Sequence, residues 1–149
     1  MTMTLAPSPV SANADLVQRF AAIIGERYVL TNADDMAPFL KEERDLWHGK
    51  AICVLRPAST QEVSQIMKLC YETNTSVVPQ GGNTGLVGGQ TPDTSGNQVV
   101  LSLGRMDKVR EIDTASNTAT IEAGLQLIRV QEVADGVDRI FPMAMRVIS

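Results

Sequence analysis

A glycine-rich stretch at residues 79–89 carries the clearest chemical signal in the sequence. It consists of Pro-Gln-Gly-Gly-Asn-Thr-Gly-Leu-Val-Gly-Gly and holds five of the 11 glycines of the chain. Glycine has no β-carbon, so successive backbone N–H groups of such a loop can approach an anion closely. The side chains of Asn83 and Thr84 add an amide and a hydroxyl as further hydrogen-bonding groups. The stretch therefore predicts a loop that binds phosphate or pyrophosphate.

Two common phosphate-binding motifs do not fit this loop. A Walker loop requires Lys-Ser or Lys-Thr after its last glycine, whereas Gly89 is followed by Gln90 and Thr91. The dinucleotide fingerprint requires glycines at positions i, i+2 and i+5, and no three glycines of the loop have this spacing. A glycine-rich surface hairpin without a ligand stays open as an alternative. Leu86 and Val87 argue against it, because such hairpins are usually short and polar.

The loop resembles the pyrophosphate loop of FAD-linked oxidases of the vanillyl-alcohol-oxidase superfamily, whose flavin domain is of the PCMH type. Within this superfamily it is most similar to the D-lactate, glycolate and D-2-hydroxyglutarate dehydrogenases. Two flanking stretches agree, residues 54–63 (VLRPASTQEV) and 101–109 (LSLGRMDKV), and the resemblance covers about residues 39–141. It implies the FAD-binding portion of a flavin-dependent 2-hydroxy acid dehydrogenase or oxidase, an FAD-linked oxidoreductase that acts on CH–OH groups.

The resemblance also implies which residues bind the cofactor. The expected contacts with the pyrophosphate come from Gly81, Gly82, Asn83, Thr84 and Gly85, and the complete expected site adds Pro79, Gln80, Leu86, Gly88 and Gly89. Some members attach the flavin covalently to a histidine directly after the paired glycines. Asn83 stands at that position here, so we expect non-covalent FAD. His48, the only histidine, is expected at the surface, and neither a catalytic residue nor a metal ligand is assigned.

A βαβ unit over about residues 51–78 is expected to deliver the loop. It consists of an apolar strand at 51–55, a helix that begins at Thr60 after the capping box Ser59-Thr60-Gln61-Glu62, and a strand at 76–78. Arg56 is expected to end the first strand and to pair with a carboxylate. Ligands gather at the carboxyl ends of parallel strands, which is where the loop begins.

The remaining elements follow from apolar spacing and turn residues. We expect disorder over residues 1–12, a helix that starts near Asn13 or Asp15, a short helix over 34–40 and a solvated charge cluster at 41–45. Further expected elements are strands at 98–103, 109–113 and 118–123 and a helix at 127–134. The predicted fold class is α+β, a truncated first α/β subdomain of a PCMH-type FAD-binding domain. It has one parallel pair and mostly antiparallel strands, and residues 13–149 form a partial FAD-binding domain.

Composition narrows the range of partners. The net charge is −4 and only 4% of the residues are aromatic, which argues against nucleic acid as a partner. Cys53 and Cys70 fall on apolar positions and are expected to be buried, reduced thiols. We expect no secretory signal at the N-terminus and no stretch that spans a membrane, and therefore a cytoplasmic protein.

The family members that the sequence resembles are several times longer than this chain. Residues after Phe141-Pro142 show no resemblance to the continuation of the family, so we expect a fragment. The 2-hydroxy acid would bind only in the full-length parent, and this chain alone is expected to be inactive and to self-associate through exposed apolar surface. The alternative is a stand-alone nucleotide-binding or interaction module without redox activity. An absorption spectrum of the purified chain separates the two hypotheses.

Overall fold

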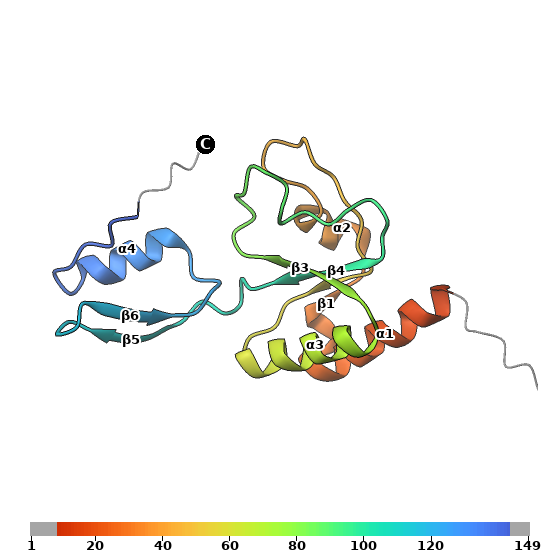
Figure 1. Cartoon of the computed structure of the whole chain (residues 1–149), viewed down its shortest axis with the longest axis horizontal. Coiled ribbons are helices and arrows are strands. Elements are labelled where there is room, and N and C mark those ends of the chain that lie inside the picture. The colour runs from red at the N-terminus through yellow and green to blue at the C-terminus, as the bar shows by residue number, and fades with distance from the viewer. Residues whose placement is uncertain (1–8, 144–149) are drawn as a thin grey trace, which may run out of the picture.

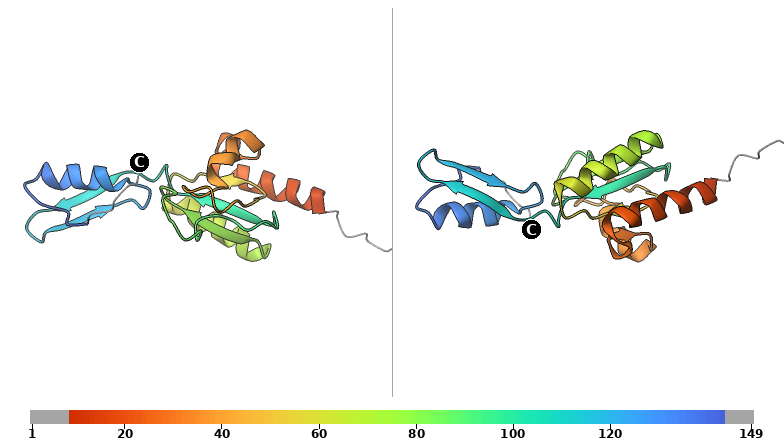
Figure 2. Two further views of the ribbon diagram at one scale, coloured as in Figure 1. Left: turned by 90° about the horizontal axis from the view of Figure 1, so that it is seen from above. Right: turned by 90° about the horizontal axis from the view of Figure 1, so that it is seen from below.

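The computed structural model describes residues 9–143 of the chain, and side chains from residue 13 onward. The elements in chain order are α1 (Pro9–Ile24), η1 (Glu26–Tyr28), β1 (Val29–Leu30), α2 (Ala33–Met36), η2 (Ala37–Phe39), β2 (Val54–Leu55), α3 (Thr60–Glu72), β3 (Ser76–Gln80), β4 (Gln98–Ser102), β5 (Val109–Asp113), β6 (Thr118–Ile121) and α4 (Leu127–Asp135). Figure 1 shows that they form two lobes: the larger contains everything up to β4, and the smaller consists of β5, β6 and α4. The two lobes follow one another along the long axis of the molecule (Figure 2).

The sheet of the larger lobe has the strand order β1-β2-β4-β3. β4 pairs in parallel with both β2 and β3, and β1 pairs antiparallel with β2. β2, α3 and β3 therefore form the expected βαβ unit, but β4 is inserted between its two strands. The sheet has two parallel pairings where one was expected. Pro79 fits into β3 because β3 is an edge strand. On its outer side no neighbouring strand needs the N–H that proline lacks.

Helices α1 and α3 pack on one face of this sheet, and together they form the hydrophobic core. The stripe of α1 is Leu16, Phe20 and Ile24, four residues apart and all buried. The core combines this stripe with Ile66, Leu69 and Cys70 of α3, and with Val29, Cys53, Leu55, Val99 and Leu101 of the sheet. Alternate residues of the strands, such as Val54, Val78 and Val100, are also buried, but they point to the other face. The short helix α2 and loops lie on that second face (Figure 1).

The capping box predicted for α3 is present in a modified form. The Ser59 hydroxyl accepts a hydrogen bond from the Glu62 N–H at 3.2 Å, as expected for an N-cap. The Glu62 carboxylate reaches back one residue further than in the usual box and accepts from the Ala58 N–H at 2.7 Å. The helix ends where Asn74 adopts a left-handed conformation with φ of 53°.

The beginning of the chain differs from the expectation. Residues 1–8, where disorder was expected, lie outside the described residues, but 9–12 are helical. The helix begins at Pro9, four residues before Asn13, because proline is well suited to the first helical position, where its missing N–H has no partner to lose. The helix expected over 34–40 is split, with one turn at Ala33–Met36 and a 3-10 turn at Ala37–Phe39, because Pro38 cannot continue an α-helix.

The smaller lobe is a β-hairpin with one helix against it. β5 and β6 pair antiparallel through a turn in which Asp113 Oδ1 accepts from the N–H groups of Ala115 and Ser116. Glu122, directly after β6, is buried and accepts hydrogen bonds from the Lys108 N–H at 3.1 Å and from the Arg110 guanidinium at 3.0 Å. These contacts fix the open end of the hairpin at the boundary between the lobes.

Candidate functional site

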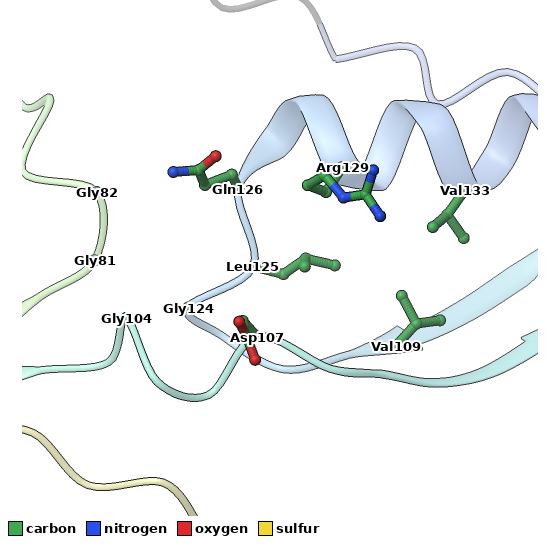
Figure 3. A pocket seen from close by; sticks show the side chains of 10 residues that line it. All are labelled: Gly81, Gly82, Gly104, Asp107, Val109, Gly124, Leu125, Gln126, Arg129 and Val133. Atoms are coloured by element: carbon green, nitrogen blue, oxygen red, sulfur yellow. The ribbon is translucent and has the colours of Figure 1, made fainter.

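A cleft of about 630 Å³ lies where the two lobes meet. The loop after β3, the turn after β4, the start of β5 and the segment leading into α4 all contribute to it. Figure 3 shows its lining residues, Gly81, Gly82, Gly104, Asp107, Val109, Gly124, Leu125, Gln126, Arg129 and Val133. This volume falls within the range of about 300–1,000 Å³ that is usual for ligand sites. The cleft therefore brings the start of the glycine loop to face elements more than twenty residues further along the chain.

In the glycine loop, several backbone carbonyl groups are hydrogen-bonded, but the backbone N–H groups are not. None of the N–H groups of residues 81–89 donates a hydrogen bond to another described residue. Three carbonyl groups of the same loop do have partners: Gly85 accepts from the Gln90 side chain, Leu86 from the Arg44 guanidinium, and Gly88 from the Thr91 N–H. A run of unbonded N–H groups held in place through its carbonyls has the hydrogen-bond donors that an anion would need.

Two polar side chains of the loop support its conformation. Gln80 is buried, and its amide donates to the carbonyl groups of Phe39 at 3.0 Å and Gln90 at 3.1 Å. The Asn83 amide donates to the carbonyl groups of Pro38 at 3.1 Å and Lys41 at 2.9 Å, and Asn83 has φ of 56°. Both side chains are thus engaged with protein, and the group that Asn83 retains for an anion is its backbone N–H.

The glycines at the cleft leave room for a ligand. A β-carbon built on Gly81 would have no heavy atom within 4 Å, and one on Gly82 would have only the Thr84 methyl group at 4.0 Å. Gly85 is different, because its β-carbon would lie 2.6 Å from the Gln90 side-chain oxygen. Neither Gly82 nor Gly85 has a positive φ, so the requirement for glycine there is one of space. The open cradle at Gly81 and Gly82 fits the close approach of a pyrophosphate.

The opposite wall of the cleft contains residues that the sequence reasoning missed. α4 begins there, and its N-cap residue Gln126 makes no side-chain capping bond, so the first N–H groups of this helix are free to meet a ligand. Arg129 also lines the cleft and forms an ion pair with Glu132. The Asp107 carboxylate is an acceptor that suits a hydroxyl group of a ligand better than a phosphate. The one sequence feature that could have pointed to this wall was Gly124, a glycine shortly before the helix predicted at 127–134.

The segment of residues 38–49, which we call the clasp, packs against the glycine loop. The sequence predicted a solvated charge cluster at residues 41–45, and this is wrong for Glu42, which is 1% exposed. Its carboxylate accepts hydrogen bonds from the N–H groups of Arg44 at 2.9 Å and Leu46 at 3.0 Å. These two bonds, with the nearby Arg44 guanidinium, hold the pKa of Glu42 below its ordinary value despite burial. The local N–H donors replace the water that the carboxylate loses.

Other residues singled out in the sequence lie outside the cleft lining. The carboxylate expected for Arg56 is not found within the described residues: its Nε is buried without a partner, and its carbonyl accepts from the Arg105 guanidinium at 2.6 Å. Met106 is buried as core. His48 is exposed and pairs with Asp45, as expected for a surface residue. The two cysteines, Cys53 and Cys70, are buried free thiols, as predicted.

A parallel strand, β3, that runs into a glycine loop opposite a helix N-terminus is an arrangement typical of modules that bind a phosphate-containing cofactor. Comparison with known families specifies the cofactor, because residues 51–149 match the model of the FAD binding domain. The chain belongs to this family of FAD-binding domains. The match runs through to residue 149, so the expectation that the resemblance stops after Phe141-Pro142 is wrong. Membership favours the FAD-binding hypothesis over the stand-alone module.

Curated relatives agree with the family. A probable D-2-hydroxyglutarate dehydrogenase of rice is 36% identical over 131 residues, which are 88% of this chain and 23% of the relative. A D-2-hydroxyglutarate–pyruvate transhydrogenase of Saccharomyces cerevisiae is 36% identical over 126 residues, 83% of this chain and 25% of the relative. A putative D-lactate dehydrogenase of Schizosaccharomyces pombe is 35% identical over 134 residues. The chain thus spans about a quarter of the length of the relatives it matches.

Solved structures show the same fold. p-Cresol methylhydroxylase superposes with a TM-score of 0.74 at 24% identity, over 88% of this chain and 26% of that chain. An alkyldihydroxyacetonephosphate synthase superposes with a TM-score of 0.75 at 20% identity, over 83% of this chain and 27% of that chain. These similarities confirm the predicted fold class, part of a PCMH-type FAD-binding domain.

One expectation about location is overturned. The rice and Schizosaccharomyces relatives are named as mitochondrial proteins, as is a D-2-hydroxyglutarate dehydrogenase of Arabidopsis thaliana, and the cytoplasmic assignment is therefore wrong. Within residues 9–143, no helix combines the length and the apolar character needed to cross a bilayer.

Proposed function

We propose that this chain supplies the pyrophosphate-binding part of the FAD site in a flavin-dependent 2-hydroxy acid dehydrogenase. The observation that carries the proposal is the run of unbonded N–H groups at residues 81–89, beside an open cradle at Gly81 and Gly82. A pyrophosphate carries negative charge and accepts hydrogen bonds from several N–H groups at once, so it matches this backbone without any lysine. The names of the relatives support a D-2-hydroxy acid such as D-2-hydroxyglutarate or D-lactate as the substrate.

The individual residues have distinct roles in this proposal. The backbone of Gly81, Gly82, Asn83, Thr84 and Gly85 holds the pyrophosphate, and Pro79, Gln80, Leu86, Gly88 and Gly89 shape the loop. The N-terminus of α4 adds a second set of N–H donors across the cleft. Asp107 binds a hydroxyl group of the cofactor. When bound, the flavin supplies the acceptor for the hydride of the substrate, and this chain orients the dinucleotide that carries it.

The FAD is held without a covalent bond. The residue after the paired glycines is Asn83, whose amide is not a nucleophile and is already engaged with Pro38 and Lys41. The single histidine of the chain, His48, pairs with Asp45 and does not line the cleft. Denaturing the flavin-loaded protein with acid should release all yellow colour into the supernatant. Flavin that stays with the precipitate would contradict this part of the proposal.

Direct titration of the purified chain with FAD tests the main proposal. We expect quenching of flavin fluorescence that saturates, and competition by ADP, which carries the same pyrophosphate. Riboflavin lacks phosphate and is the matched control, so it should not compete at equal concentration. Absence of saturable FAD binding, or equal competition by riboflavin, would remove the glycine loop from the site.

A further inference from the structure

The glycine loop is positioned by the clasp through contacts that lie far apart in the sequence. Asn83 donates to the carbonyls of Pro38 and Lys41, and Gln80 donates to that of Phe39. The Arg44 guanidinium donates to the carbonyl of Leu86. At the far end of the loop, a β-carbon on Gly88 would lie 3.2 Å from the Trp47 ring, so backbone and indole are in close contact. Residues 80–88 are thus held along their length by one other segment.

The shape of the clasp depends on the buried carboxylate of Glu42. One oxygen accepts from the Arg44 N–H and the other from the Leu46 N–H, which closes a tight turn. The Glu42 N–H donates to the Trp47 carbonyl at 3.2 Å, and a bridge between Lys41 and His48 completes the turn. The Glu42 carboxylate also lies 3.7 Å from the Arg44 Nε. The same carboxylate therefore sets both the backbone of the clasp and the direction of the Arg44 side chain.

We propose that Glu42 and Arg44 are positioning residues for FAD: Glu42 folds the clasp, and Arg44 fixes a peptide plane of the glycine loop. This inference rests on the proposed function, because it assigns a task to residues that do not line the cleft. The reason lies in peptide geometry. A trans peptide is planar, and its C=O and following N–H point in opposite directions. Holding the Leu86 carbonyl from the clasp therefore directs the Val87 N–H away from it.

A second plane is held in the same way. The Gln90 side chain donates to the Gly85 carbonyl at 2.6 Å and thereby fixes the Leu86 N–H. Two successive planes of the loop are thus set by side chains before any ligand binds. A loop ordered in advance loses less conformational entropy when it binds an anion, and this raises affinity.

The experiment compares variants of the clasp with matched controls. Glu42→Gln keeps the size of the side chain but has only one acceptor oxygen for two N–H donors, and Arg44→Ala removes the contact with Leu86. Glu62→Gln is the control for the first, because only one Glu62 oxygen accepts a hydrogen bond from a described residue. Arg19→Ala is the control for the second, since the Arg19 side chain is 45% exposed and that of Arg44 48%.

Two readouts are measured, the dissociation constant of FAD and the ¹⁵N heteronuclear NOE of residues 84–88 in the free chain. We expect Glu42→Gln and Arg44→Ala to weaken FAD binding about 10-fold and to lower the NOE values, because a charge-assisted hydrogen bond is lost. Arg44→Lys should lie between Arg44→Ala and the wild type, since an ammonium can still reach the Leu86 carbonyl. Both controls should stay within about 2-fold of the wild type, because Glu62 bonds only at the start of α3 and Arg19 is an exposed residue, so neither contacts the clasp or the glycine loop.

The outcomes separate this inference from the proposed function. If the wild-type chain does not bind FAD, the proposed function fails, and the NOE values of the free chain still decide whether Arg44 orders the loop. Unchanged NOE values in Arg44→Ala would overturn the inference. If the wild type binds FAD, an Arg44→Ala variant with the same FAD affinity as the wild type would overturn it too. Arg44→Ala keeps the test available if Glu42→Gln fails to fold, because Arg44 is an exposed residue.

Discussion

The backbone of Gly124 lies directly against Leu103, so that a β-carbon on Gly124 would stand 1.8 Å from the Leu103 carbonyl oxygen. The Gly124 N–H donates to the Met106 carbonyl at 2.8 Å at the same place. This contact joins the segment before α4 to the turn after β4, beside the cleft that Gly124 lines (Figure 3).

Replacing this glycine should therefore loosen the joint between the lobes. Gly124→Ala is expected to lower the free energy of unfolding by about 2 kcal/mol, because the new methyl group must displace backbone atoms. Gly89→Ala is the control, since a β-carbon there would meet no atom within 4 Å. Urea unfolding followed by circular dichroism measures both, and equal midpoints for the two variants would contradict the prediction.

Filling the cradle at the cleft should abolish cofactor binding without unfolding the protein. Gly82→Val places branched carbon atoms in the open space where the pyrophosphate is proposed to lie, so we expect no measurable FAD binding. The melting temperature should stay close to that of the wild type, because the nearest side-chain atom lies 4.0 Å from the new β-carbon. Thr94→Val, at an exposed position outside the cleft, should bind FAD normally. Retained affinity in Gly82→Val would remove this glycine from the site.

The N-cap of α3 makes a separate contribution to stability. Ser59→Ala removes the acceptor of the Glu62 N–H and should lower the free energy of unfolding by about 1 kcal/mol. Ser59→Asp retains an acceptor oxygen and should restore most of the loss. Thermal unfolding of the three proteins at neutral pH tests this order, and a Ser59→Asp variant as unstable as Ser59→Ala would refute the capping role.

Both thiols should be inert in the folded protein. Burial raises the pKa of Cys53 to about 12, and the neighbouring Cys70 adds to this shift; burial raises the pKa of Cys70 to about 11. The unfolded chain loses these protons near the ordinary value of 9.0, so stability is retained below that pH and decreases as pH rises through it. A disulfide reagent at about pH 8 should label neither thiol in the native protein and both in denaturant. Rapid native labelling would show that the core opens easily.

Acid should destabilise the boundary between the lobes through Glu122. The Lys108 N–H, and then the Arg110 guanidinium, lower the pKa of its carboxyl, so the unfolded chain takes up this proton first as pH falls. Stability is therefore present above the ordinary glutamate pKa and is lost below it. The melting temperature measured against pH should fall less steeply in Glu122→Gln than in the wild type. An identical slope would mean that Glu122 is not responsible.

The sequence allowed the local elements to be predicted where side-chain chemistry acts over a few residues. Ser59 and Glu62 marked the start of α3, and the observed helix begins at Thr60 as expected. β5 has the predicted bounds at Val109–Asp113, because the turn residues after it end the strand. The glycine loop could be recognised from the sequence for a similar reason, because its density of glycines is itself a local signal of backbone without β-carbons.

Features that depend on distant partners could not be predicted from local patterns. A charged run gives no indication that Glu42 is buried, because its partners are N–H groups of its own turn. The second wall of the cleft, at Gln126 and Arg129, faces the loop only because the chain doubles back after β6. The position of β4 between β2 and β3 could not be predicted either, because the hydrophobic pattern of the strands is compatible with several strand orders.

The position of β4 has a consequence for the order in which the protein folds. β2 and β3 are both made before β4 during synthesis, yet neither has a parallel partner until residues 98–102 emerge. α3 can form early from local contacts, whereas the parallel pairing of β3 with β4 must await closure of the loop of residues 81–97, and that of β2 with β4 a longer closure. The rate-limiting step of folding is therefore expected to be the docking of one central strand. The glycine loop acquires its shape in that same step, because it lies in the segment that this docking closes.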